Sequence, residues 1–188
     1  MRLTGRSLMV RYAAAFALPL LLAGCAGAPK VFGEDPSAKP FVLEETFLGR
    51  GVGEGEFRNA VSGSARPFRV RFNGTRMRDG LTLAEDIAYA DGEKERHVWR
   101  FTRTGSNTYE GRRDDVVGVA HGVVSGNTLR LSYDVKLKTG GSTAQVHFDD
   151  TLVLHAPGVV LNKAKVSKFG VAFGTVDIAI SMLAKRGG

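Results

Sequence analysis

Cysteine is nearly absent from this chain, which has a single one, Cys25, among 188 residues. One cysteine cannot form an intramolecular disulfide, so a disulfide-stapled fold is excluded. Long apolar runs are scarce as well. The run at residues 12–24, "YAAAFALPLLLAG", has 13 residues, whereas a helix that spans a membrane needs roughly 20. Pro19 inside the run also argues against a permanent membrane helix, because proline removes a backbone hydrogen bond.

The short apolar run has the form of a secretory signal peptide. Arg2, Arg6 and Arg11 precede it without any acidic residue, and small residues end it. Residues 22–25, Leu-Ala-Gly-Cys, resemble the bacterial lipobox, in which the chain is cut before the cysteine and the thiol receives a diacylglycerol. We therefore expect residues 1–24 to be removed and Cys25 to be lipidated. The alternative is an ordinary signal peptide followed by a chance or buried cysteine.

A lipidated Cys25 implies a stable membrane anchor. A lipobox product carries two or three acyl chains, and two such signals suffice for permanent anchoring. Residue 26 is Ala rather than Asp, which favours the outer membrane, with the protein facing the periplasm. Residues 25–40, "CAGAPKVFGEDPSAKP", are rich in proline and glycine and predict a flexible tether, which extends to at most about 50 Å.

Charge of one sign is not in large excess. Removal of residues 1–24, which hold three arginines and no acid, leaves 23 basic and 19 acidic residues, a net charge of +4. This mild, scattered excess does not indicate a nucleic-acid partner. A local basic stretch is interpreted either as a solvated strand face or as a contact with anionic lipid head groups. It contains Arg66, Arg69, Arg71, Arg76 and Arg78.

Sequence signatures of catalysis are missing too. The chain has no GxSxG, no glycine-rich phosphate loop and no CxxC. Asp114-Asp115 and Asp149-Asp150 are adjacent pairs, and neighbours in a strand point to opposite faces. The four histidines, His97, His121, His147 and His155, are interpreted as surface residues that bind no metal. We expect no enzyme, no cofactor and no metal, although a histidine and a carboxylate converging in a cleft would favour an enzyme.

Residues 41–188 predict one all-β domain. In "RPFRVRFN" and "LRLSYDVKL" apolar and polar residues alternate, which is the period of a strand. Turn signals separate the runs, and Asp91-Gly92 is typical of a hairpin. We expect about nine or ten strands, no helix, and an antiparallel meander that closes into a barrel.

Four segments carry a family resemblance: "DGEKERHVWRFTRTG", "YEGRRDDVVGVAHGVVSGNTLRLSY", "VHFDDTLVL" and "NKAKVSKFG". They resemble the bacterial lipoproteins of domain of unknown function 3833, over residues 41–183. The resemblance implies a small envelope lipoprotein with a lipocalin-like barrel and implies no established activity. It also hints at an acyl-type ligand, because members of the family are often encoded beside enzymes that modify fatty acids.

Several polar residues occur at positions that alternation assigns to apolar faces. A buried charge is costly unless it is paired and hydrogen-bonded, so these residues predict a polar cluster inside the barrel. Trp99 and Phe101 share a face and would line the same interior. The cluster is interpreted either as a structural salt-bridge network or as the site of a ligand head group. The candidate residues are Glu85, Asp150, Asn162 and Lys168.

The segment "VVGVAHGVV" bears on how much room the barrel holds. Gly118, Ala120 and Gly122 share one face, which leaves unfilled volume if it points inward and marks bends if it points outward. Three functions compete: a lipoprotein that binds a small apolar or acyl-type ligand, a structural or partner-binding envelope protein with a filled barrel, and an enzyme. A cavity of roughly 300 Å³ or more would favour the first.

Overall fold

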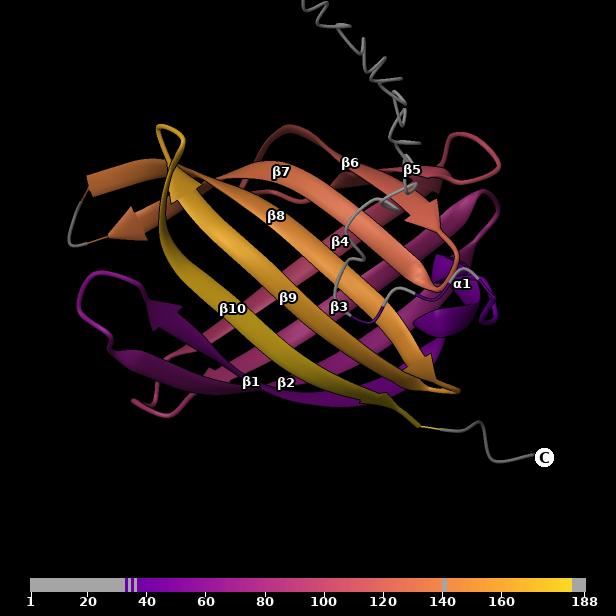
Figure 1. Cartoon of the computed structure of the whole chain (residues 1–188), viewed down its shortest axis with the longest axis horizontal. Coiled ribbons are helices and arrows are strands. Elements are labelled where there is room, and N and C mark those ends of the chain that lie inside the picture. The colour runs from indigo at the N-terminus through magenta and orange to yellow at the C-terminus, as the bar shows by residue number, and fades with distance from the viewer. Residues whose placement is uncertain (1–32, 34, 36, 140–141, 184–188) are drawn as a thin grey trace, which may run out of the picture.

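The computed structural model describes residues 33, 35, 37–139 and 142–183. Cys25 and the predicted signal peptide lie outside these residues. The described part contains one short helix and ten strands (Figure 1). They are α1 (Leu43–Thr46), β1 (Gly49–Asn59), β2 (Ala65–Met77), β3 (Gly80–Tyr89), β4 (Lys94–Arg103), β5 (Thr108–Arg112), β6 (Val116–Ser125), β7 (Thr128–Thr139), β8 (Ser142–Ala156), β9 (Val159–Lys168) and β10 (Val171–Met182).

The strands form a closed antiparallel barrel. Each strand pairs with its neighbour in sequence, and β1 pairs with β10 to complete the ring. The strands cross the barrel obliquely, as closure of a sheet requires (Figure 1). The prediction of an antiparallel meander that closes into a lipocalin-like barrel of nine or ten strands is confirmed.

Alternation of side chains positions the interior. In β2, Phe68, Val70 and Phe72 are buried, whereas Arg69 and Arg71 are exposed. Because successive residues of a strand point to opposite faces, one set fills the barrel and the other meets water. The same rule places Leu129, Leu131 and Val135 of β7 inside, among the buried residues.

The expectation of no helix is wrong in one place. Helix α1 lies at one end of the barrel, and Phe41, Leu43 and Phe47 are almost fully buried there. Its four residues are too few to display the 3.6-residue period by which a helix is found in a sequence. We call this plugged end the closed end.

The opposite end, which we call the mouth, is formed by five hairpin connections. They are β1–β2, β3–β4, β5–β6, β7–β8 and β9–β10, because in a meander alternate turns lie at the same end. The chain enters at the closed end, where the Asn127 side chain hydrogen-bonds to the backbone of Gly33 and Asp35.

The small residues of β6 leave less space than their size suggests. Ala120 and Gly122 are buried, but a Cβ atom on Gly122 would lie 3.3 Å from both Leu129 and Tyr109. These larger side chains fill the space beside the strand. Gly118 has φ +76° and lies within a register shift of β6, so it serves as a bend.

Candidate functional site

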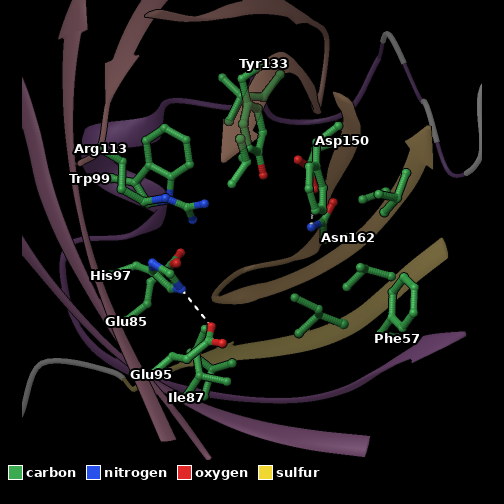
Figure 2. A pocket seen from close by; sticks show the side chains of 18 of the residues that line it. Phe57, Glu85, Ile87, Glu95, His97, Trp99, Arg113, Tyr133, Asp150 and Asn162 are labelled. Carbon is green, nitrogen blue, oxygen red and sulfur yellow. Dashed lines mark hydrogen bonds and ion pairs between the residues drawn. The ribbon is translucent and has the colours of Figure 1, made fainter. Parts of the chain in front are cut away.

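A cavity of about 900 Å³ occupies the barrel between the plug and the mouth. Its volume lies within the range of small-molecule sites. Most of its wall is apolar, and side chains from opposite sides of the barrel point into it (Figure 2). The cavity therefore exceeds the roughly 300 Å³ that favours a small-molecule site over a filled barrel.

Aromatic side chains line one part of the cavity wall. The rings of Trp99 and Phe101, both on β4, stack with centroids 5.1 Å apart. Tyr133 of β7 meets Trp99 edge-on, also at 5.1 Å, and stacks against Phe148 of β8 at 5.3 Å. Such pairs stabilise one another beyond their buried area, so this wall is well packed.

Asp150 and Asn162 form a polar pair on the neighbouring strands β8 and β9. Asn162 Nδ2 donates a hydrogen bond to Asp150 Oδ1 at 2.8 Å. Two other side-chain oxygens of the pair, Asp150 Oδ2 and Asn162 Oδ1, are buried and accept no hydrogen bond within the described part of the chain. Burial raises the pKa of Asp150 to about 6, against the opposing effects of the Asn162 amide, the Tyr133 hydroxyl and Arg113. Apart from the nearby Tyr133 hydroxyl, which acts to lower the pKa of Asp150, the pair presents two buried acceptors that no described residue satisfies.

Glu85 of β3 adds a second carboxyl to the interior. Burial raises its pKa, although the nearby Arg113 and His97 oppose this rise. Glu85 retains some exposed surface because it borders the cavity. Figure 2 shows Glu85 below Arg113 and beside His97.

Arg113, in the β5–β6 connection, reaches from the mouth into the cavity (Figure 2). Its guanidinium lies 4.6 Å from the centre of the Trp99 ring. It also forms two hydrogen bonds with Asp115, from Nε to Oδ1 at 2.5 Å and from Nη2 to Oδ2 at 2.9 Å. Asp115 therefore shares the positive charge of Arg113 with Glu85 and Asp150, whose pKa values Arg113 also acts to lower.

His97 also lines the cavity, so its interpretation as a surface residue is wrong. Its Nε2 lies 3.0 Å from Glu95 Oε2, and its Nδ1 lies 4.0 Å from Asp115 Oδ2. The hydrogen bond with His97 is the largest cause of a lowered pKa of Glu95. His97, Trp99 and Phe101 are two residues apart along β4 and therefore share a face of the strand. The alternation that places the two aromatic residues inside also predicts an inward His97.

All six predicted site residues line the cavity, but at different depths. Glu85, Trp99, Phe101, Asp150 and Asn162 lie in its interior. Lys168 is exposed at the last position of β9, where its Nζ lies 5.5 Å from the centre of the Phe169 ring. Six residues of strand, about 20 Å, separate it from Asn162. The cation that faces the two carboxyls is therefore Arg113, which the sequence analysis did not single out.

Neither a metal-binding cluster nor a membrane-spanning helix occurs in the described residues. These residues contain no cluster of three or more His, Cys, Asp or Glu side chains that could hold a metal ion. They also contain no helix long and apolar enough to cross a membrane.

Comparison with known families gives one match to this chain. Residues 19–182 match the model of the family described as "Protein of unknown function (DUF3833)". The chain belongs to the DUF3833 family. Comparison with curated proteins found no match.

Solved structures resemble the DUF3833 barrel at low sequence identity. The S-type phycobiliprotein lyase CPES from Guillardia theta is 9% identical with a TM-score of 0.57, covering 77% of this chain and 92% of that one. Rv2717c from M. tuberculosis is 11% identical with a TM-score of 0.53, covering 74% and 94%. At such identity the likeness concerns the fold, which is a lipocalin-like barrel.

Proposed function

We propose that this DUF3833 protein is a lipid-anchored lipoprotein of the bacterial envelope that binds a small, largely apolar ligand inside its barrel. The observation that carries the proposal is the cavity of about 900 Å³, with aromatic walls and a few convergent polar groups. This combination is the usual form of a small-molecule site. The anchor on Cys25 and the outer-membrane location rest on the lipobox and on Ala26.

The polar groups of the cavity favour a ligand whose head group donates hydrogen bonds. Asp150 Oδ2 and Asn162 Oδ1 lack donors, and a buried acceptor without a donor is costly. Arg113 is already bound to Asp115, so it is less available to an anionic head group. An amine or hydroxyl on an apolar body, such as an alkyl chain, complements this arrangement better than a carboxylate.

The size of the cavity disfavours the alternative of a purely structural barrel with a filled interior. A filled barrel would leave no space for a larger inward side chain, whereas a cavity would accept one. Ala164 of β9 is 3% exposed and lines the cavity, which makes Ala164→Phe a test of the two alternatives. We expect the variant to fold with nearly unchanged stability and to lose ligand binding.

The ligand class can be tested by fluorescence of Trp99, the single tryptophan of the chain. The ten strands and helix α1 lie within residues 43–182, so a chain that begins at Ala26 contains all of them. Dodecylamine, dodecanol and dodecanoate share one apolar body and differ in the head group. We expect saturable changes in Trp99 emission with the amine and the alcohol, weaker binding of dodecanoate, and no binding to Ala164→Phe.

Two neighbouring carboxyls supply a matched control for the head group. Asp150→Asn changes the inward carboxyl, whereas Asp149→Asn changes the outward one on the same strand. The inward change should weaken binding of dodecylamine more than that of dodecanol, and the outward change should affect neither. Equal binding of all three compounds would contradict the head-group argument. Absence of any saturable binding would contradict the proposed function itself.

One observation favours an acid–base enzyme as a second candidate. His97 lies in the cavity wall between the carboxylates of Glu95 and Asp115, an arrangement that can move a proton to or from a bound molecule. The candidate would be supported if the bound molecule were chemically converted during incubation with the unaltered protein, and if His97→Gln bound the molecule without converting it. Recovery of the unchanged ligand would count against it.

A further inference from the structure

Large apolar side chains are exposed on three hairpins at the mouth. Val61 in the β1–β2 turn is 86% exposed, Phe169 and Val171 at the β9–β10 turn are 94% and 70% exposed, and Leu137 near the end of β7 is 36% exposed. The barrel order β1-β10-β9-β8-β7 makes these three hairpins consecutive along the rim. They lie together at the left end of the barrel in Figure 1. We call these four residues the apolar rim.

Phe169 is an unusual choice for the backbone position that it occupies. It has φ +52°, and the following Gly170 has φ +79°. A two-residue hairpin with two positive φ angles favours Asn-Gly, because asparagine tolerates the left-handed region far better than a bulky residue does. Among the described residues Phe169 is the only non-glycine with positive φ. Since its ring is almost fully exposed, neither turn geometry nor core packing explains the phenylalanine.

The charges around the mouth divide it into two halves. Lys136 and Lys168 flank the apolar rim, are exposed, and form no ion pair with described residues. The other two connections, β3–β4 and β5–β6, carry acidic residues that are largely paired with Arg66 and Arg113. These are Asp91 and Glu93 in the first, and Asp114 and Asp115 in the second.

The basic stretch noted in the sequence does not contribute unpaired charge at this site. Arg66 pairs with Asp91 and Glu93, and Arg69 pairs with Glu54. Lys136, whose backbone N–H donates to the carbonyl of Asp115, and Lys168 are therefore exposed cations of the mouth whose ammonium groups form no ion pair with described residues. Their position next to exposed apolar tips is the pattern of a surface that inserts into the head-group region of a bilayer.

An apolar path joins the rim to the cavity. Phe57 of β1 and Phe173 of β10 line the mouth, with ring centroids 6.5 Å apart. They lie just inside the hairpins that carry Val61, Phe169 and Val171. A ligand that left a bilayer at the apolar rim would thus meet apolar side chains before it reached the interior.

We propose that the apolar rim docks on a lipid bilayer that contains anionic head groups, with Phe169 inserted at the interface and Lys136 and Lys168 beside the lipid phosphates. This surface is distinct from the anchor on Cys25, because the chain enters the barrel at the closed end. The proposal depends on the described surface alone and does not require the cavity to bind a ligand.

Flotation with lipid vesicles tests the proposal on the chain that begins at Ala26, which lacks the lipidation site. Vesicles of phosphatidylethanolamine with phosphatidylglycerol should bind the protein, and Phe169→Asn should weaken that binding about tenfold, or about 1.4 kcal/mol. Asparagine suits the left-handed turn, so thermal unfolding of Phe169→Asn should occur at an equal or higher temperature.

Val52→Thr is the matched control, because Val52 is 47% exposed on strand β1, away from the turns of the mouth. It should leave vesicle binding unchanged. Replacing Lys136 and Lys168 together with glutamine should reduce binding only to vesicles with phosphatidylglycerol. Failure of the unaltered protein to float, or equal flotation of Phe169→Asn, would overturn the proposal. Self-association through the rim without vesicle binding, abolished by Phe169→Asn, would overturn it as well.

Discussion

Replacing Asp150 with asparagine should stabilise the barrel at neutral pH. Asp150 is 7% exposed, and burial raises its pKa from an ordinary value of 3.8 to about 6. Above pH 6 the folded protein must therefore hold an ionised carboxylate in a site that disfavours the charge. Asparagine has nearly the same shape, carries no charge, and its amide oxygen can accept the hydrogen bond that Asn162 donates.

The size of the effect follows from the two pKa values. Between about pH 4 and pH 6 the folded protein binds a proton that the unfolded chain has released, so the free energy of unfolding falls as pH rises through this window. The difference between about 6 and 3.8 corresponds to about 3 kcal/mol at 1.36 kcal/mol per pH unit. Because a buried amide also costs free energy, we expect Asp150→Asn to gain about 1 to 3 kcal/mol at pH 7.5.

Urea unfolding at several pH values between 4 and 8 measures this effect. The free energy of unfolding of the unaltered protein should fall between pH 4 and pH 6, and that of Asp150→Asn should change less.

Asp149→Asn is the matched control. Burial opposes ionisation of Asp149, but hydrogen bonds with Lys165, His147 and Ser132 lower its pKa overall. Its stabilising effect is present above the unfolded pKa and lost on acidification, so Asp149→Asn should destabilise slightly, by less than about 1 kcal/mol. Destabilisation by Asp150→Asn at pH 7.5 would refute the reasoning.

Two further predictions concern the plug and the anchor. Glu44 is buried and accepts hydrogen bonds from Arg103 at 3.0 and 2.8 Å and from the Tyr109 hydroxyl at 2.9 Å. Glu44→Gln should therefore lower the free energy of unfolding by about 2 kcal/mol, measured in urea at pH 7, and an unchanged value would mean that these bonds contribute little. Cys25→Ser should appear in the soluble fraction or as an uncut precursor upon cell fractionation, whereas normal membrane retention would contradict lipidation at this residue.

Much of the fold follows from alternation in the sequence. The buried Phe68, Val70 and Phe72 and the exposed arginines between them indicate a strand without any knowledge of its neighbours. Short turns then leave an antiparallel meander as the simplest arrangement. Helix α1 could not be found in this way, because a single turn has no measurable period. The register shift in β6 was equally hidden, since it depends on the pairing of two strands.

The same alternation accounts for what was and was not predicted at the site. It assigns Glu85, Asp150 and Asn162 to the interior because the face of a residue depends on its parity along the strand. It does not give the height of a residue along the barrel, which is why Lys168 was grouped with residues that lie far deeper. Arg113 lies in a connection, where alternation no longer applies. Its side chain is held in the cavity by the hydrogen bond with Asp115 and by its contact with the Trp99 ring.

The central claim, that the barrel holds a small apolar molecule, is tested most directly by mass spectrometry of molecules that remain bound to the protein purified from the cells that produce it. The account predicts one molecule per barrel, with an apolar body and an amine or hydroxyl head group, and its loss in Ala164→Phe. The claim would be contradicted if the unaltered protein and Ala164→Phe carried the same small molecules, or if neither carried any.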